Sequence, residues 1–205
     1  DAIVHATHTL TLELPKLAFF FADNARYVGE WHVLPIGLDR DFIGTLKPEA
    51  ELIQTADVAR LLPQRNKFSH KGTFGHAWLL AGGKGKMGAA LISSKGCLRS
   101  GVGLLSVHVP AGMEALVLGY LPEAMVSSDA DPDALSSMPH FEKCSAIGIG
   151  PGIGKSEATA RLLKLLIQEA PVPWVSDADA LNILSEKKTW LSFLANGTIL
   201  TPRPK

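Results

Sequence analysis

The chain has 205 residues, 46% of them hydrophobic and 20% charged, a composition typical of one globular domain or one and a half. Twenty basic residues balance twenty acidic ones, so charge gives no reason to expect binding to nucleic acid or a membrane surface. The two cysteines, Cys97 and Cys144, are too few for a disulfide framework and fit a reducing, cytoplasmic compartment. No apolar run reaches the roughly 18 residues of a membrane span.

The first residues, DAIVHATHTL, lack the basic and apolar segments of a signal peptide and an initiator Met. We therefore expect the chain to begin within a longer protein. Residues 3–14 alternate in period two and predict a strand that ends at Pro15, and residues 31–38 predict a second short strand. No convincing helix joins them, so residues 1–45 are expected to be the closing strands of a sheet.

Residues 47–63 have helical spacing and predict a linker helix that Pro63 stops, followed by a polar, glycine-containing loop over residues 64–76. Beyond it, apolar runs and helical patterns alternate, which is typical of βαβ units in a parallel sheet. The last strand has no helix to cover it, so the sheet is expected to be incomplete. The predicted strands cover residues 77–82, 102–110 and 197–204, and the predicted helices cover residues 89–101 and 156–170, with Ser156 as N-cap. Residues 144–154 predict a strand that runs into a glycine turn, and residues 172–184 predict a strand, a turn and the start of a helix.

The stretch AGGKGKMGAA, residues 81–90, follows the first of these strands. A Walker A loop is excluded because Met87 stands where Ser or Thr is required. Gly83, Gly85 and Gly88 match the dinucleotide fingerprint, but the acidic residue expected about 20 positions on is replaced by His108. A glycine-rich turn without a ligand is a further alternative. Lysines between glycines at a helix N-terminus favour an anion site.

Other strands end in similar chemistry: GIGPGIG at residues 148–154, SDADALN at 176–182 and TPRP at 201–204. Because the carboxyl ends of parallel strands share one edge, these segments are expected to meet and to bind a ligand together. Asp177 and Asp179 could alternatively serve only as caps of the following helix.

The ordered set HKGTFGHAWLLAGGKGKMGAA, LPEAMV, AIGIGPGIG, SDADALN and ILTPRP resembles the ADP/ATP-dependent NAD(P)H-hydrate dehydratases. The resemblance covers about residues 60–204 and implies a ribokinase-like, three-layer α/β fold. The preceding HTLTLELPKLAFFFADNARYVGEWHVLPIGL resembles the end of the Rossmann-like NAD(P)H-hydrate epimerase domain, which many bacteria fuse upstream of the dehydratase. The division expected is residues 1–45 for the epimerase remnant, 46–63 for the linker and 64–205 for the dehydratase part.

The resemblance implies a repair activity with Mg²⁺ and either ADP or ATP. The nucleotide phosphorylates the ring hydroxyl of NAD(P)H hydrate, and loss of phosphate restores the double bond, while the epimerase interconverts the hydrate epimers. A homo-oligomer is expected, since exposed sheet invites association. The rival functions are a ribokinase-like kinase of small hydroxymethyl compounds and, for a chain that truly ends at residue 205, a non-catalytic nucleotide-binding module.

Carried over by motif, the residues that contact the substrate would be Gly88, Ala89, Gly150, Gly152, Gly154 and Arg203. Asp177, Asp179 and Asn182 would lie beside them. Lys71 and His76 are candidates for phosphate contact, although a solvated loop is the expectation for both. Thr11 aligns with a hydroxyl near the K⁺ ion of the epimerases, and an exposed strand threonine is the alternative.

The sequence also departs from the family. Arg203 stands where a His is usual, and it can bind phosphate but cannot titrate near neutral pH. Pro35 replaces an Asp of the epimerase tail. The family's catalytic Asp, in a later GTGD motif, and its adenine-binding loop would follow residue 205. No general base is therefore assigned, and a polypeptide that ends at residue 205 is expected to be inactive.

Overall fold

The computed structural model describes residues 2–62, 64–141 and 143–203 and divides the chain into two units, residues 1–64 and 65–205. In the first unit, β1 (His8–Leu12) and β2 (Glu30–Leu34) pair in parallel. Between them the chain forms η1 (Leu17–Phe20), η2 (Ala22–Asn24) and the one-turn helix α1 (Ala25–Val28). The two predicted strands exist, but each is shorter than the alternating pattern indicated.

Two short helices complete the first unit. Asp39 caps α2 (Arg40–Thr45) by accepting from the backbone N–H groups of Asp41 and Phe42. The prediction of one helix over residues 47–63 is wrong for its first half, since only α3 (Thr55–Leu61) is helical and none of its residues is buried. Without a face to bury, a segment this short gains little from helix formation. Its predicted stop, Pro63, lies outside the described residues.

The second unit is built on a six-stranded, fully parallel sheet in the order β5-β4-β3-β6-β7-β8. This confirms the predicted α/β class. The strand predicted over residues 197–204 is reduced to two residues, and its end at Pro204 is not described. The strands are β3 (His76–Leu80), β4 (Leu104–Val109), β5 (Met125–Ser128), β6 (Ala146–Ile149), β7 (Trp174–Ser176) and β8 (Ile199–Leu200).

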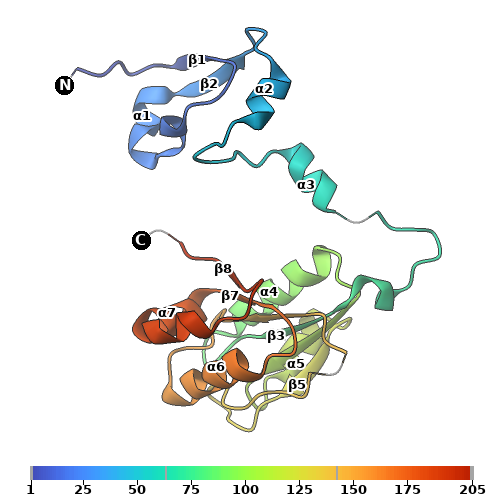
Figure 1. The fold of residues 1–205 in the computed structure, drawn as a ribbon. Coiled ribbons are helices and arrows are strands. Elements are labelled where there is room, and N and C mark those ends of the chain that lie inside the picture. Colours follow the sequence, from blue (N-terminus) through green and yellow to red (C-terminus); the bar gives the residue numbers. More distant parts are fainter. Residues whose placement is uncertain (1, 63, 142, 204–205) are drawn as a thin grey trace. The chain divides into compact units, whose positions relative to one another are not determined.

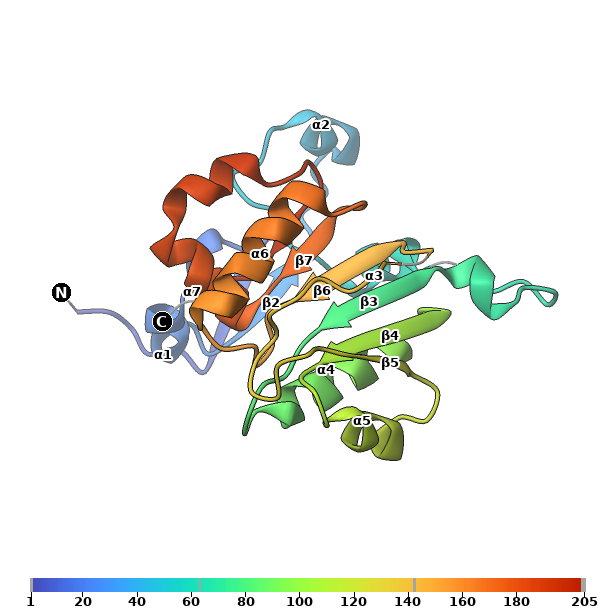
Figure 2. The same ribbon diagram turned by 90° about the horizontal axis from the view of Figure 1, so that it is seen from below.

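Helices cover both faces of this sheet, which makes three layers (Figure 2). On one face, α4 (Met87–Arg99) and α5 (Glu114–Tyr120) pack against Leu79, Leu105 and Val107. On the other, α6 (Glu157–Glu169) and α7 (Ala178–Glu186) pack against Trp78, Ile147 and Ile149. Neighbouring β3 residues therefore enter opposite cores, as the period of a strand buried on both faces requires.

Several elements were not predicted: α2, α5, β5, η3 (Lys71–Phe74) and η4 (Lys188–Phe193). Ser156 does cap α6, because its side chain accepts from the Thr159 N–H. Both cysteines are free and half-buried, and burial raises the pKa of each thiol. Within the described residues, none of the helices has the length and apolar character needed to cross a membrane.

Candidate functional site

The strand order places a switch point beside β3. The chain runs from β3 outward through β4 and β5, then returns to the other side of β3 and runs outward again through β6, β7 and β8. In parallel α/β sheets, ligands bind at such a switch point, outside the carboxyl ends of the strands. The glycine-rich loops after β3 and β6 are the two loops at this point.

The two glycine loops pack directly against each other. The Gly82 N–H donates to the Pro151 carbonyl at 2.8 Å. A Cβ on Gly83 would lie 2.8 Å from the Gly152 carbonyl oxygen, and a Cβ on Gly152 would lie 3.0 Å from the Ala89 Cβ. Side chains on Gly83 or Gly152 would therefore separate the two loops, whereas a Cβ on Gly85 or Gly88 would meet no heavy atom within 4 Å.

Gly150 is required for a different reason. It has a φ of +133°, and a Cβ there would overlap the backbone carbonyl of Asp177. The Asp179 N–H donates to the Gly150 carbonyl at 3.3 Å, and the Asp177 N–H donates to that of Ile149 at 3.0 Å. The β6 loop and the start of α7 are therefore held in direct backbone contact.

Asp179 joins three of the predicted segments. Its Oδ2 accepts from the Gly154 N–H at 2.8 Å and pairs with the Lys86 ammonium at 3.4 Å, and its Oδ1 accepts from Asn182 at 3.3 Å. The side chain of Asp179 is 19% exposed and that of Lys86 is 54% exposed. Asp179 thus fixes the glycine loop of β6 beside that of β3, and it does not act as a helix cap.

Asp177 is not a side-chain cap either. It occupies the N-cap position of α7 without a capping hydrogen bond, and its Oδ1 accepts from the Thr201 hydroxyl at 2.8 Å. A surface depression of about 570 Å³ lies here, lined by residues that include Asp177, Asn182, Thr201 and Arg203. Ala178, also in the lining, has a φ of +47°, which is uncommon for a residue other than glycine.

The N-terminus of α4 offers hydrogen-bond donors. Within the described residues, the N–H groups of Gly85, Met87 and Gly88 have no protein acceptor. Gly88 is exposed, does not have a positive φ, and would meet no heavy atom within 4 Å if it carried a Cβ. Open space next to unused amide donors at a helix N-terminus suits an anion.

Two of the predicted residues lie elsewhere. Lys71 belongs to η3, before β3, and its carbonyl closely approaches Gly103, which precedes β4. His76 opens β3, and its Nε2 lies 2.8 Å from the Ser106 hydroxyl. Both are therefore at the amino end of β3, opposite the edge where the glycine loops meet, and the structure does not bring them to the other candidates.

Thr11 lies on β1, in the first unit. The alternative of an exposed strand threonine is wrong, because Thr11 is only 5% exposed and its hydroxyl donates to the Leu14 carbonyl at 3.1 Å. The bond ties the end of β1 to the turn at Pro15.

The sequence reasoning missed a buried polar cluster at the ends of β4 and β5. His108 Nε2 lies 3.2 Å from Asp129 Oδ2, and the side chains are 2% and 0% exposed. Asp129 also accepts from the N–H and hydroxyl groups of Ser136 and Ser137 and from the Asp131 N–H. In the sequence, His108 stands where the dinucleotide fingerprint would have an acid, and nothing there indicates Asp129 as its partner.

Burial and hydrogen bonding have opposite effects on the pKa values of His108 and Asp129. Burial lowers the pKa of His108, although the hydrogen bond and charge of Asp129 act to raise it. Burial alone would raise the pKa of Asp129, but the hydrogen bonds from Asp131, Ser136 and Ser137 outweigh it and hold that pKa well below its ordinary value. A neutral His108 that donates to an ionised Asp129 is the state consistent with both directions.

Comparison with known proteins decides the family. Residues 77–205, which include both glycine loops, Asp177, Asp179 and Arg203, match the family described as NAD(P)H-hydrate dehydratase. The chain belongs to this family.

Whole relatives of the dehydratase family align with nearly all of the chain. The bifunctional NAD(P)H-hydrate repair enzymes Nnr of Moorella thermoacetica and Coxiella burnetii are 31% and 33% identical to it, and each alignment covers 98% of the chain. The chain spans only 39% and 40% of their lengths. The ADP-dependent (S)-NAD(P)H-hydrate dehydratase of Bacillus subtilis is 36% identical over 147 residues, which cover 72% of the chain and 51% of that protein.

Solved structures agree with the fold. The ADP/ATP-dependent NAD(P)H-hydrate dehydratase of Bacillus subtilis, co-crystallised with ATP/Mg²⁺, superposes with a TM-score of 0.51 at 35% identity, covering 62% of the chain and 45% of that protein. A ribokinase-like protein of Enterococcus faecalis gives a TM-score of 0.55 at 24% identity over 69% of the chain and 49% of its own length. These confirm the ribokinase-like fold of the dehydratase part.

Proposed function

We propose that the second unit contributes the hydrate-binding part of a nicotinamide-nucleotide repair enzyme, which uses ADP or ATP to dehydrate NAD(P)H hydrate. The observation that carries the proposal is the position of Asp179, which bonds to Gly154 and Lys86 and so joins the two glycine loops and the DADALN segment. All of these segments lie within residues 77–205, the range that matches the dehydratase family.

The chemistry accounts for the kind of site. Hydroxide is a poor leaving group, so the enzyme first transfers a phosphoryl group from the nucleotide to the ring hydroxyl of the hydrate. The C–O bond then breaks and inorganic phosphate leaves, while the neighbouring ring carbon loses a proton to the departing phosphate or to water, so that the ring double bond returns. Such a reaction needs donors that hold negative charge in place, because phosphoryl transfer depends mainly on positioning and electrostatic stabilisation.

Backbone amides supply those donors in our proposal. The N–H groups of Gly85, Met87 and Gly88 bind a phosphate group of the dinucleotide, and the open space at Gly88 admits it. Ala89, Gly150, Gly152 and Gly154 line the substrate, and Asp177, Asp179 and Asn182 lie beside it. The positive φ of Ala178 supports a functional edge here, because strained backbone gathers at binding sites.

Arg203 and Asp177 have specific roles in the proposal. Arg203, in the lining of the depression, binds a substrate phosphate through its guanidinium group. Mg²⁺ prefers carboxylate oxygens and neutralises phosphate charge when it is bound. Within the described residues Asp177 Oδ2 has no hydrogen-bond partner, so we assign it as the protein oxygen available to Mg²⁺. We assign no general base among residues 1–205.

The first unit is part of the same proposal. We assign residues 1–45 to the end of an epimerase domain, residues 46–63 to a linker and residues 64–205 to the dehydratase part. The Thr11 hydroxyl, held beside the Leu14 carbonyl, is the group we assign near a K⁺ ion. The proposal includes a cytoplasmic homo-oligomer, in keeping with soluble nicotinamide substrates and free thiols.

The proposal is tested on the full-length gene product with hydrated NADH, Mg²⁺ and ADP or ATP. We expect nucleotide-dependent recovery of the absorbance of reduced nicotinamide, with release of inorganic phosphate.

Arg203→Ala should raise KM for the hydrate about tenfold and change kcat little, because a charge-assisted hydrogen bond contributes roughly 1.5–3 kcal/mol of uniform binding. Arg203→His should retain most activity.

Two outcomes would contradict this assignment. A folded full-length protein without nucleotide-dependent recovery would reject the dehydratase function. A stable phosphorylated product without release of phosphate would identify a kinase instead. An unchanged KM in Arg203→Ala would remove only Arg203 from the site.

A further inference from the structure

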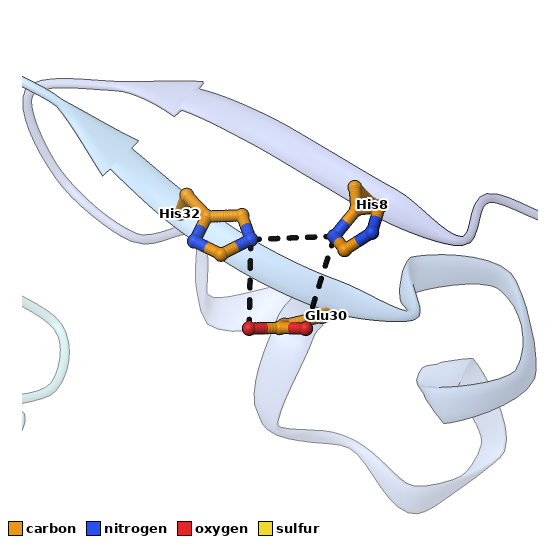
Figure 3. A group of neighbouring side chains, drawn as sticks. All are labelled: His8, Glu30 and His32. Atoms are coloured by element: carbon orange, nitrogen blue, oxygen red, sulfur yellow. Dashed lines mark hydrogen bonds and ion pairs between the residues drawn. The ribbon is translucent and has the colours of Figure 1, made fainter.

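Two histidines and a glutamate meet on one face of the first unit, on the strand pair β1–β2 (Figure 3). His8 lies opposite Glu30 in the parallel register, and His32 follows Glu30 by two positions on the same strand. Side chains two positions apart on a strand point to the same face, so all three side chains project together. The cluster is far in sequence from the glycine loops and takes no part in the proposed dehydration.

The three ligand atoms lie close to one another. His8 Nδ1 is 3.4 Å from His32 Nε2, 3.8 Å from Glu30 Oε2, and Glu30 Oε1 is 3.6 Å from His32 Nε2. Two ligand atoms held at roughly 2.0–2.2 Å from a tetrahedral zinc ion lie about 3.3–3.5 Å apart. The pair of nitrogens already has this spacing, and a small rotation of the Glu30 side chain brings the carboxylate to it.

The chemistry of the ligand set is also selective. Two imidazoles and one carboxylate form a set used by zinc sites that keep a fourth position open. Imidazole favours late first-row cations over Mg²⁺ and Ca²⁺, which prefer oxygen ligands. The side chains are 56%, 69% and 45% exposed for His8, Glu30 and His32, so a cation can reach them without opening the fold.

We propose that His8, Glu30 and His32 form a zinc-binding site on the β1–β2 face, with a water molecule as the fourth ligand. Metal-bound imidazoles in tight sites donate their second ring N–H to a fixed acceptor, and such partners raise affinity by about 10–100-fold. Within the described residues, the second ring nitrogens of His8 and His32 have no such partner. The site should therefore bind zinc less tightly than sites in which the imidazoles have such partners.

The test is calorimetric titration of ZnCl₂ into the whole chain after treatment with a chelator. We expect one zinc ion per chain, and at least tenfold weaker binding in His8→Ala, in His32→Ala and in Glu30→Gln. His5→Ala is the matched control, because His5 lies on the same unit, is exposed, and contacts the Arg26 carbonyl instead of the cluster. Its binding should equal that of the native chain.

A second measurement needs no substitution and stands if a variant fails to fold. In NMR spectra of the native chain, the ring signals of His8 and His32 should change at one equivalent of zinc, ahead of those of the other histidines among the seven. Cobalt in place of zinc should give the intense visible absorption of a tetrahedral centre. Absence of stoichiometric binding, or equal perturbation of all histidines, would overturn the proposal.

Discussion

Glycines at positions 88 and 150 occur in similar motifs, but the structure gives them different physical roles. Gly150 has a positive φ and touches the backbone of Asp177, whereas Gly88 is exposed and faces open space. The first is a requirement of folding. Gly88 leaves room beside unused amide donors, so a substitution there is the better test of ligand binding.

Substitution of the two glycines should separate folding from binding. Gly88→Val should leave the free energy of unfolding within about 1 kcal/mol of the native value, because a Cβ at this exposed position would meet no heavy atom within 4 Å. It should abolish binding of the hydrate. Gly150→Ala should destabilise by about 3 kcal/mol or more through backbone strain and overlap with Asp177. Urea unfolding followed by circular dichroism, with calorimetric hydrate binding, measures both. Native hydrate binding by a folded Gly88→Val variant would place the substrate elsewhere.

The His108–Asp129 cluster predicts loss of stability on acidification. The folded-state pKa values of both groups lie below their ordinary values of 6.5 and 3.8, so the native chain binds fewer protons than the unfolded chain as pH falls. The contribution of His108 is complete above its ordinary pKa and is lost as pH falls through the folded value. That of Asp129 is complete above its own ordinary pKa and is lost only in stronger acid.

The variant His108→Gln isolates the contribution of the histidine to the pH dependence of stability. The difference in the free energy of unfolding between the native chain and His108→Gln should shrink between about pH 7 and about pH 5. Urea titrations at a series of pH values provide the measurement. A difference that widens toward low pH would mean that a protonated His108 forms an ion pair with Asp129 in the folded chain.

At the scale of the element, α6 shows how a single side chain fixes a helix start. Ser156 Oγ accepts from the Thr159 N–H at 3.1 Å and so satisfies one of the helix's unpaired donors. Ser156→Ala should reduce the free energy of unfolding by about 1 kcal/mol, whereas Ser156→Asp, which can accept the same bond, should stay near the native value. Chemical denaturation of the two variants gives the comparison. If Ser156→Ala and Ser156→Asp were both as stable as the native chain, the capping hydrogen bond would contribute nothing to stability.

The elements predicted well from sequence are those whose apolar pattern is long and fully buried. The run at Trp78, Leu79 and Leu80 and the helical pattern of α6 fall in this class. The elements missed have weak patterns: β5 contains an exposed Met125 and two serines, and α5 buries only Val117. The sequence of residues 47–63 has helical periodicity, but the helix that forms there, α3, buries none of its residues. Periodicity alone does not reveal whether a helix has a surface to pack against.

Only some features of the candidate site could likewise be predicted from the sequence. Asp177, Asp179 and the second glycine cluster could be placed at one edge because strand direction alone brings them there. The roles of Lys86 and Thr201 could not be predicted, since they depend on which side chains reach across between loops. The same holds for Asp129 and for the cluster at His8, where only the strand register joins residues distant in the chain.

At the scale of the whole molecule, the division into two units predicts where a protease cuts first. The boundary falls between Gln64 and Arg65. Near it lie α3, which buries none of its residues, and the exposed residues Arg60, Arg65 and Lys67. Limited trypsin digestion should cleave after one of these and leave a fragment that begins there and contains the six-stranded sheet. Mass spectrometry of the early products identifies the cut. A first cleavage within residues 71–203 would contradict the prediction.

The central position of β3 also affects the order in which the strands of the sheet pair during folding. Its contact with β4 joins residues such as His76 and Ser106, 30 apart in the chain, whereas its contact with the β6 side joins His76 and Ser145, 69 apart. Closing the longer loop costs about 0.7 kcal/mol more in chain entropy, roughly a threefold difference in probability. The β3–β4 half is thus favoured to nucleate first. The two glycine loops meet only when β6 docks, so we expect the edge that they form together to be completed late in folding.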